Sequence, residues 1–120
     1  GSTFIDDTFN NNPDAAIAAI DYLASTKGKK ILVFQPMIEL GAYAESAHRR
    51  VGEAASKICD EIILTNKNYY DAFMSGITDK KKVQIYDPKA AGKYLRSTVG
   101  PGDTILFKSK EAEKILHELV

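Results

Sequence analysis

The chain has 120 residues and a mass of 13.2 kDa, the size of one domain with a core of its own. Its 16 basic and 16 acidic side chains give no formal net charge, so bulk electrostatic binding to nucleic acid or to an anionic membrane is not expected. No apolar run is long enough to span a bilayer. The single cysteine, Cys59, cannot form a disulfide within the chain, which favours a reducing compartment.

The chain opens in a way that indicates a piece of a longer protein. Gly1-Ser2 resembles a remnant of cloning and is set aside from the fold. Residues 3–7 already have the pattern of a strand. We therefore expect residues 3–120 to form one domain cut from a larger chain.

Strands and helices are predicted to alternate along the chain. The first helix follows Asn12 as N-cap and Pro13 at the first helical position, and Gly28 is its predicted stop. Asp87-Pro88 repeats the same start signal. Short apolar runs predict strands at 3–7, 31–34, 61–64, 83–86 and 104–107, and helices at 13–27, 45–58, 69–74, 88–98 and 111–120.

This alternation predicts an α/β fold: a three-layer, Rossmann-like domain with a mainly parallel sheet of five to six strands and helices on both faces. Ligands of such sheets bind at the carboxyl ends of the strands. Four loops are expected at that edge, and they span residues 6–12, 35–44, 65–68 and 108–110.

Common catalytic signatures are missing from the sequence. There is no G-x-x-x-x-G-K-[ST] phosphate loop, no G-x-G-x-x-G dinucleotide fingerprint and no G-x-S-x-G nucleophile turn. Cys59, His48 and His117 do not have the spacing of metal ligands. We therefore assign no catalytic and no metal-binding residue to this chain.

The first loop concentrates polar side chains ahead of a helix N-terminus. It contains Asp6, Asp7, Asn10, Asn11 and Asn12. Backbone N–H groups and the helix dipole at such a position suit a phosphate or a metal-bound nucleotide. The alternative is that Asn12 only caps the helix and the other residues only form a turn.

The second and last loops supply further candidates. Glu39 in the second loop could bind or orient a polar ligand, and Lys108 could meet a carboxylate or a phosphate, or stand exposed at the start of the final helix. A single helical histidine such as His48 is more often a structural residue than a catalyst. Tyr69 and Tyr70 are interpreted as packing residues rather than as a stacking platform.

Three motifs in order resemble the Mur ligases. Residues 5–14, I-D-D-T-F-N-N-N-P-D, resemble the family's D-D-S-Y-N-A-N-P-D. Residues 37–41, M-I-E-L-G, followed by H-R-R-V-G at 48–52, resemble G-D-M-x-E-L-G and H-x-x-V-G. Residues 105–109, I-L-F-K-S, resemble L-V-K-G-S-R. These motifs are most similar to the branch of the family that adds D-alanyl-D-alanine, and they cover nearly the whole chain.

The resemblance implies the C-terminal domain of a three-domain, ATP-dependent, ADP-forming ligase of cytoplasmic peptidoglycan precursor synthesis. The absent central domain would carry the phosphate loop and hold most of the Mg²⁺, and a UDP-muramyl peptide would be joined to an amino acid or dipeptide. The C-terminal domain would close over ATP and present the incoming amine. By the same resemblance, Asp7, Asn10 and Asn12 would face the nucleotide, and Glu39, Lys108 and Ser109 would face the amine substrate.

The sequence departs from the family pattern at three places. Gln35-Pro36 stands where the family has Gly-Asp, Phe9 replaces a tyrosine, and Lys108-Ser109-Lys110 is a shortened form of K-G-S-R. One alternative is therefore a non-catalytic, Mur-like domain that binds a nucleotide or a partner. Another is a receiver-like signalling domain, with Asp6-Asp7 and Lys108 as its acidic pair and lysine, although Thr65-Asn66 supplies no phospho-accepting aspartate.

Overall fold

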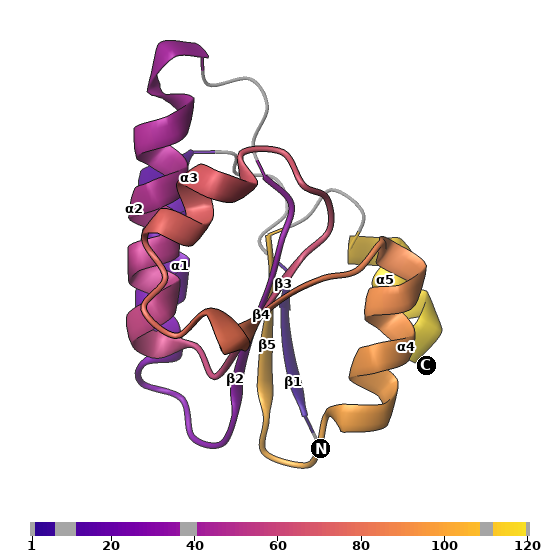
Figure 1. Cartoon of the computed structure of the whole chain (residues 1–120). Coiled ribbons are helices and arrows are strands. Elements are labelled where there is room, and N and C mark those ends of the chain that lie inside the picture. The colour runs from indigo at the N-terminus through magenta and orange to yellow at the C-terminus, as the bar shows by residue number, and fades with distance from the viewer. Residues whose placement is uncertain (1, 7–11, 37–40, 109–111, 120) are drawn as a thin grey trace.

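The structure is a computed structural model that describes residues 2–6, 12–36, 41–108 and 112–119. Five parallel strands form one sheet in the order β1-β5-β2-β3-β4 (Figure 1). The strands are β1 (Thr3–Asp6), β2 (Lys30–Phe34), β3 (Glu61–Leu64), β4 (Val83–Ile85) and β5 (Thr104–Lys108). The predicted parallel sheet is confirmed.

Helices cover both faces of the sheet, as the alternating pattern predicted. On one face lie α1 (Pro13–Leu23), α2 (Ala44–Ile58) and α3 (Tyr70–Ser75), and on the other lie α4 (Pro88–Thr98) and α5 (Ala112–Leu119) (Figure 1). Two short 3₁₀ turns precede α2 and β4 at Gly41–Tyr43 and Lys80–Lys82. Right-handed crossovers between parallel strands produce this three-layer arrangement.

The core consists of two apolar clusters, one on each side of the sheet. Alternate residues of a strand point to opposite faces, so Leu32 and Phe34 of β2 enter the cluster under α1, α2 and α3, whereas Ile31 and Val33 enter the cluster under α4 and α5. The central strands β2 and β5 are therefore apolar on both faces. At the sheet edge, β1 leaves Phe4 40% exposed.

The two predicted N-caps are present. The Asn12 side-chain oxygen accepts a hydrogen bond of 2.8 Å from the Asp14 backbone N–H, and Asp87 accepts one of 2.8 Å from that of Ala90. In each case the proline that follows needs no hydrogen-bond partner for its nitrogen. These side chains fix where α1 and α4 begin.

The predicted end of α1 at Gly28 is wrong. The helix ends at Leu23, where the Thr26 hydroxyl and backbone N–H both donate to the Leu23 carbonyl. Gly28 lies in the following turn with φ +76°, and a Cβ there would come within 2.4 Å of the Gly102 carbonyl oxygen. Because Gly28 has no side chain, the turn before β2 can pack against the turn before β5 at the amino end of the sheet.

Close backbone packing joins α2 to α3. A Cβ on Gly52 would lie 2.3 Å from the Phe73 carbonyl oxygen, and one on Gly76 would lie 2.4 Å from that of Arg49. Glycine at both positions lets the two backbones touch. This contact sets the position of α3 and of the loop that precedes it.

We predict that Gly52→Ala destabilises the chain by about 1–3 kcal/mol, although alanine is the better helix former. The added methyl group must push the Phe73 carbonyl away and separate α2 from α3. The free energy of unfolding in urea measures the effect. Lys57→Ala, at an exposed position of the same helix, is the control and is expected to change it by less than about 0.5 kcal/mol. An unchanged Gly52→Ala variant would contradict the packing argument.

Candidate functional site

The carboxyl ends of all five parallel strands lie at one edge of the sheet, which is where the sequence predicts a ligand. Of the six predicted site residues, the structure describes Asn12 and Lys108. Asp7, Asn10, Glu39 and Ser109 lie outside the described residues. Their proposed roles stay predictions.

Asn12 is exposed at the start of α1, and its side-chain oxygen is the helix cap. The capping role is therefore confirmed, whereas a nucleotide contact stays a prediction. An ion pair of 2.7 Å between Asp14 and Arg50 joins this first turn of α1 to α2. Both partners are exposed, so the pair adds little stability.

Lys108 is the last residue of β5 and is only 7% exposed. It is paired in register with Phe34 of β2, and its carbonyl accepts a 3.0 Å hydrogen bond from the Gln35 backbone N–H. The interpretation as an exposed helix start is wrong, because the strand continues one residue further than predicted. Lys108 is therefore part of the buried interior of this edge.

His48 is fully buried in the second turn of α2. Its Nδ1 lies 2.5 Å from the Ala44 carbonyl oxygen, which can only accept, so Nδ1 carries the proton. The ring stacks on Tyr69 with centroids 4.5 Å apart and also meets Phe34 at 6.1 Å. Burial lowers the pKa of His48 below its ordinary value, outweighing the hydrogen bond to Ala44. The structural interpretation of this histidine is confirmed.

The third loop extends one residue further than predicted, to Tyr69, because α3 begins at Tyr70. Tyr69 adopts the left-handed region with φ 54° and ψ 29° immediately before α3. For a bulky residue this costs about 1–3 kcal/mol and persists only where the surroundings hold it. The stack on His48 provides such a constraint and confirms that Tyr69 is a packing residue. Thr65, at the start of the same loop, buries a hydroxyl that has no hydrogen-bond partner among the described residues.

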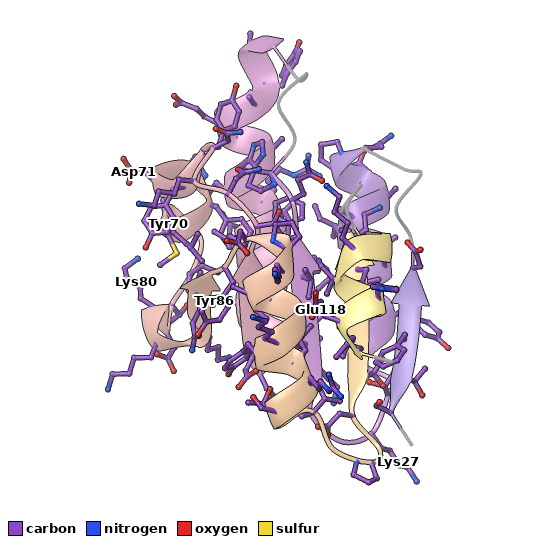
Figure 2. All side chains as sticks on the ribbon, turned by 90° about the vertical axis from the view of Figure 1, so that its right-hand side faces the viewer. Lys27, Tyr70, Asp71, Lys80, Tyr86 and Glu118 are labelled. Atoms are coloured by element: carbon purple, nitrogen blue, oxygen red, sulfur yellow. The ribbon has the colours of Figure 1, made fainter. Side chains whose placement is uncertain are left out.

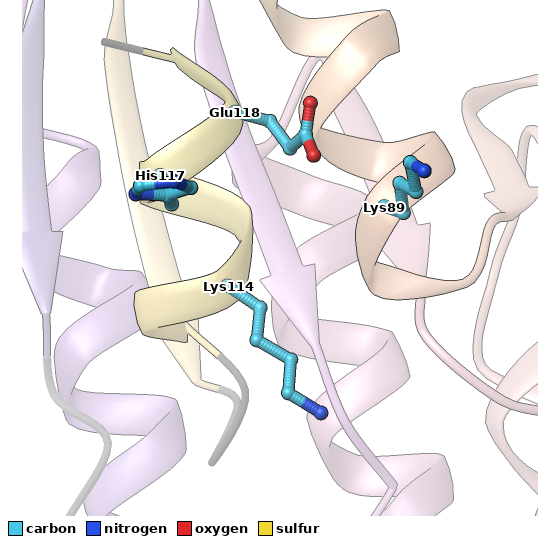
Figure 3. A pocket seen from close by; sticks show the side chains of 4 residues that line it. All are labelled: Lys89, Lys114, His117 and Glu118. Carbon is cyan, nitrogen blue, oxygen red and sulfur yellow. The ribbon is translucent and has the colours of Figure 1, made fainter.

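Surface cavities lined by described residues lie on both helical layers. One, of about 530 Å³, lies between α4 and α5 and is lined by Lys89, Lys114, His117 and Glu118 (Figure 3). Two more, of about 500 and 340 Å³, adjoin α2 and α3 and share Glu45, Ala72 and Ser75. Figure 2 shows Tyr70 and Asp71 of α3 at one side of the molecule, away from Glu118.

Reactive groups are few in the part of the chain that the structure describes. Cys59 is buried, and burial raises the pKa of its thiol to about 12, so it is not a thiolate nucleophile at neutral pH. The described residues contain no group of three or more His, Cys, Asp or Glu side chains able to hold a metal ion. Within the same ranges, no helix is both long and apolar enough to cross a membrane.

Residues 1–111 match a family described as "Mur ligase, glutamate ligase domain". The chain belongs to the Mur ligase family.

The order of the strands excludes the receiver-like interpretation. In this sheet β1 lies at the edge, whereas a flavodoxin-like sheet has the strand order 2-1-3-4-5.

Known Mur ligases resemble the chain over almost its whole length. It is 32% identical to the UDP-N-acetylmuramoyl-tripeptide–D-alanyl-D-alanine ligase of Synechocystis over 90% of the chain and 24% of that protein. The ligase of the same name from Buchnera aphidicola is 42% identical over 97% of the chain and 26% of that protein. The chain thus spans about a quarter of the length of these relatives.

A solved Mur ligase confirms the fold. The MurF ligase of Thermotoga maritima, in complex with ADP, aligns with a TM-score of 0.82 and 29% identity over 99% of this chain and 28% of the other. The α/β sheet with helices on both faces is therefore the fold of this part of a Mur ligase.

We predict that the stability of the chain rises with pH through the range in which an ordinary histidine titrates. The folded state lowers the pKa of His48, so the unfolded chain binds more protons at low pH. The free energy of unfolding should be fully recovered above about pH 6.5 and fall as the pH drops below that value.

Urea unfolding at about pH 7.5 and 5.5 measures this slope. His117→Gln, which alters the exposed histidine of α5, should keep the slope, and His48→Phe should remove most of it. A slope that survives in His48→Phe would contradict the assignment.

Asp103 contributes to the pH dependence of stability at lower pH. Hydrogen bonds from the Gly100 and Lys29 backbone N–H groups lower the pKa of its carboxyl below 3.8.

Proposed function

We propose that the chain is the C-terminal domain of an ATP-dependent Mur-type ligase of cytoplasmic peptidoglycan precursor synthesis. In the intact protein, it would close over ATP and present an amino acid or a dipeptide to the activated UDP-muramyl peptide. The observation that carries this proposal is the likeness over 99% of the chain to a MurF ligase bound to ADP. Supporting it, two of the family motifs include the last residue of a strand, since Asp6 ends β1 and Lys108 ends β5.

The proposed reaction has two steps. A peptide carboxylate attacks the γ-phosphate of ATP, which forms an acyl phosphate and releases ADP. The incoming amine then attacks the acyl carbon, an amide bond forms and phosphate leaves. Because an acyl phosphate also reacts with water, a domain that closes over it protects the intermediate.

The six site candidates divide between the two ligands. Asp7, Asn10 and Asn12 would face the nucleotide. Asn12 fits this assignment because it stands at the N-terminus of α1, where the helix dipole favours a phosphate. The chain has no phosphate loop, so ATP and Mg²⁺ would be held mainly by the central domain.

Glu39, Lys108 and Ser109 would face the incoming amine substrate. Lys108 fits this role because it is the last residue of β5, at the ligand edge, where a lysine could balance the carboxylate of an amino acid or dipeptide. This assignment does not specify the amine, because Gln35-Pro36 and the shortened last loop differ from the family pattern.

A second candidate function is a Mur-like domain that binds a nucleotide or a partner without catalysis. The observation that favours it is Gln35-Pro36, since Pro36 is buried and supplies no carboxylate where the family has Gly-Asp. The two functions make opposite predictions for the intact protein.

We expect the intact protein to release ADP from Mg-ATP and a UDP-muramyl peptide only when a suitable amino acid or dipeptide is added. A panel of acceptors, followed by a coupled ADP assay, identifies the amine. The isolated chain should show no turnover because it has no phosphate loop. Absence of ADP release with every acceptor, from protein shown to be folded, would favour the non-catalytic function.

We also expect Asp7→Ala to raise the KM for ATP about tenfold or more in the intact protein, the effect of losing one charge-assisted hydrogen bond. The melting temperature should change little, because the proposed role is in binding. Asp21→Ala, at an exposed position of α1, is the matched control and should leave the KM unchanged. A large loss of melting temperature with an unchanged KM would assign Asp7 to the fold instead.

A further inference from the structure

We propose that His48 is a positioning residue for the amine-substrate side of the site, acting by joining two loops of the carboxyl edge through one buried ring. The proposal rests on the proposed function for the identity of the substrate. The joining of the loops rests on the structure of this chain alone.

The ring of His48 contacts both ends of the second loop. Phe34 is the last residue of β2, and its ring lies 6.1 Å from that of His48. Ala44 is the first residue of α2, and its carbonyl oxygen accepts the hydrogen bond from Nδ1. The segment between these two residues is the one in which the sequence places Glu39.

The same ring also holds the end of the third loop. It stacks on Tyr69 with 17° between the ring planes. Tyr69 is the non-glycine residue with a positive φ in the part of the chain that the structure describes. The beginning of this loop is fixed to the second strand, since the Thr65 backbone N–H donates a 3.1 Å hydrogen bond to the Phe34 carbonyl. His48 and Phe34 together therefore set the position of the third loop relative to the end of β2 and the start of α2.

The rest of the H-x-x-V-G motif supports this arrangement. Val51 is buried in the core cluster, and Gly52, one turn after His48, lets the Phe73 carbonyl approach α2. Phe73 in turn stacks on Phe34 with centroids 5.5 Å apart. The motif thus docks α3 and its preceding loop onto α2 and β2. A positioning role explains the histidine without placing it among the reacting groups.

A shift of His48 should affect the amine side of the site more than the nucleotide side. Phe34 is in register with Lys108, the proposed contact for the amine substrate, and the next residue, Gln35, is hydrogen-bonded to it. Asn12, the proposed nucleotide contact, caps a different helix, whose first turn is fixed by that cap and is joined to α2 by the exposed Asp14–Arg50 ion pair, which adds little stability. Comparing the KM for the amine substrate with the KM for ATP in the intact enzyme therefore distinguishes this role from a general loss of structure, which would change both.

The test compares variants of His48 in the intact protein. His48→Asn keeps a donor near the position of Nδ1 and loses the ring, whereas His48→Phe keeps the ring and loses the donor. We expect His48→Asn to raise the KM for the amine substrate about tenfold with the KM for ATP within about twofold, because small displacements of positioned groups have effects of this size or larger. His48→Phe should restore the KM for the amine to within about threefold of the wild-type value. His117→Ala, at the exposed histidine, is the control.

Tyr69→Gly provides a second route if His48→Asn does not fold. Glycine accepts the left-handed conformation without strain, so this change removes the stack while relieving the backbone. It should raise the KM for the amine as His48→Asn does, with the melting temperature within a few degrees of the wild-type value. Variants that lose melting temperature but keep both KM values would overturn the proposal.

Hydrogen exchange in this chain distinguishes failure of the inference from failure of the proposed function. If the intact wild-type protein shows no amine-dependent ADP release, the proposed function has failed, and the joining of the loops is still measurable. His48→Asn should then speed amide exchange in residues 65–70, and His48→Phe should leave it near the wild-type rate. Equal exchange in all three chains would overturn the positioning role.

Discussion

The pairing of β2 with β5 is the constraint on which the rest of this structure depends. Ile31 to Phe34 and Ile105 to Phe107 form adjacent, fully apolar strands that must be covered on both faces. That requirement puts α1, α2 and α3 on one side and α4 and α5 on the other (Figure 1). It also brings Phe34 and Lys108 together at the carboxyl edge, where the last residue of each strand meets the loops of the candidate site.

Packing between helices holds the described residues near this edge in place. Gly52 and Gly76 allow α2 and α3 to touch through their backbones, and His48 fills the space between the end of β2, the start of α2 and Tyr69. The strained conformation of Tyr69 is held by these neighbours. A family motif that lies on a helix, away from the loops, is thereby connected to the proposed substrate side of the site.

The proposed division of labour between domains would account for the lack of a catalytic signature in this chain. The chain spans about a quarter of the length of related ligases, and one of those relatives carries ADP in its structure. We propose that a domain of this kind contributes closure, water exclusion and contacts to the amine, while the phosphate chemistry belongs to the rest of the protein. The altered residues Gln35-Pro36 and the shortened last loop are then the places where the choice of amine, or the loss of catalysis, would be decided.

Local sequence signals determined the elements and where most of them begin. The Asn12-Pro13 and Asp87-Pro88 pairs predicted two helix starts because a capping oxygen and a proline act within one turn. Continuous apolar runs predicted the buried strands for a similarly local reason. The predicted helix end at Gly28 is wrong because the hydroxyl of Thr26 caps the end of α1 earlier. Gly28 instead allows a close contact with Gly102, which is distant in sequence.

Only the tertiary structure decided the order of the strands, the burial of Lys108 and His48, and the left-handed conformation of Tyr69. Each of these depends on contacts between residues distant in sequence, and a tyrosine has no local preference for positive φ. The motifs alone identified the family, because their residue types and order are visible in the sequence. That the ring of His48 in one of these motifs meets Phe34 and Tyr69 became visible only in the folded structure, because these residues are distant in sequence.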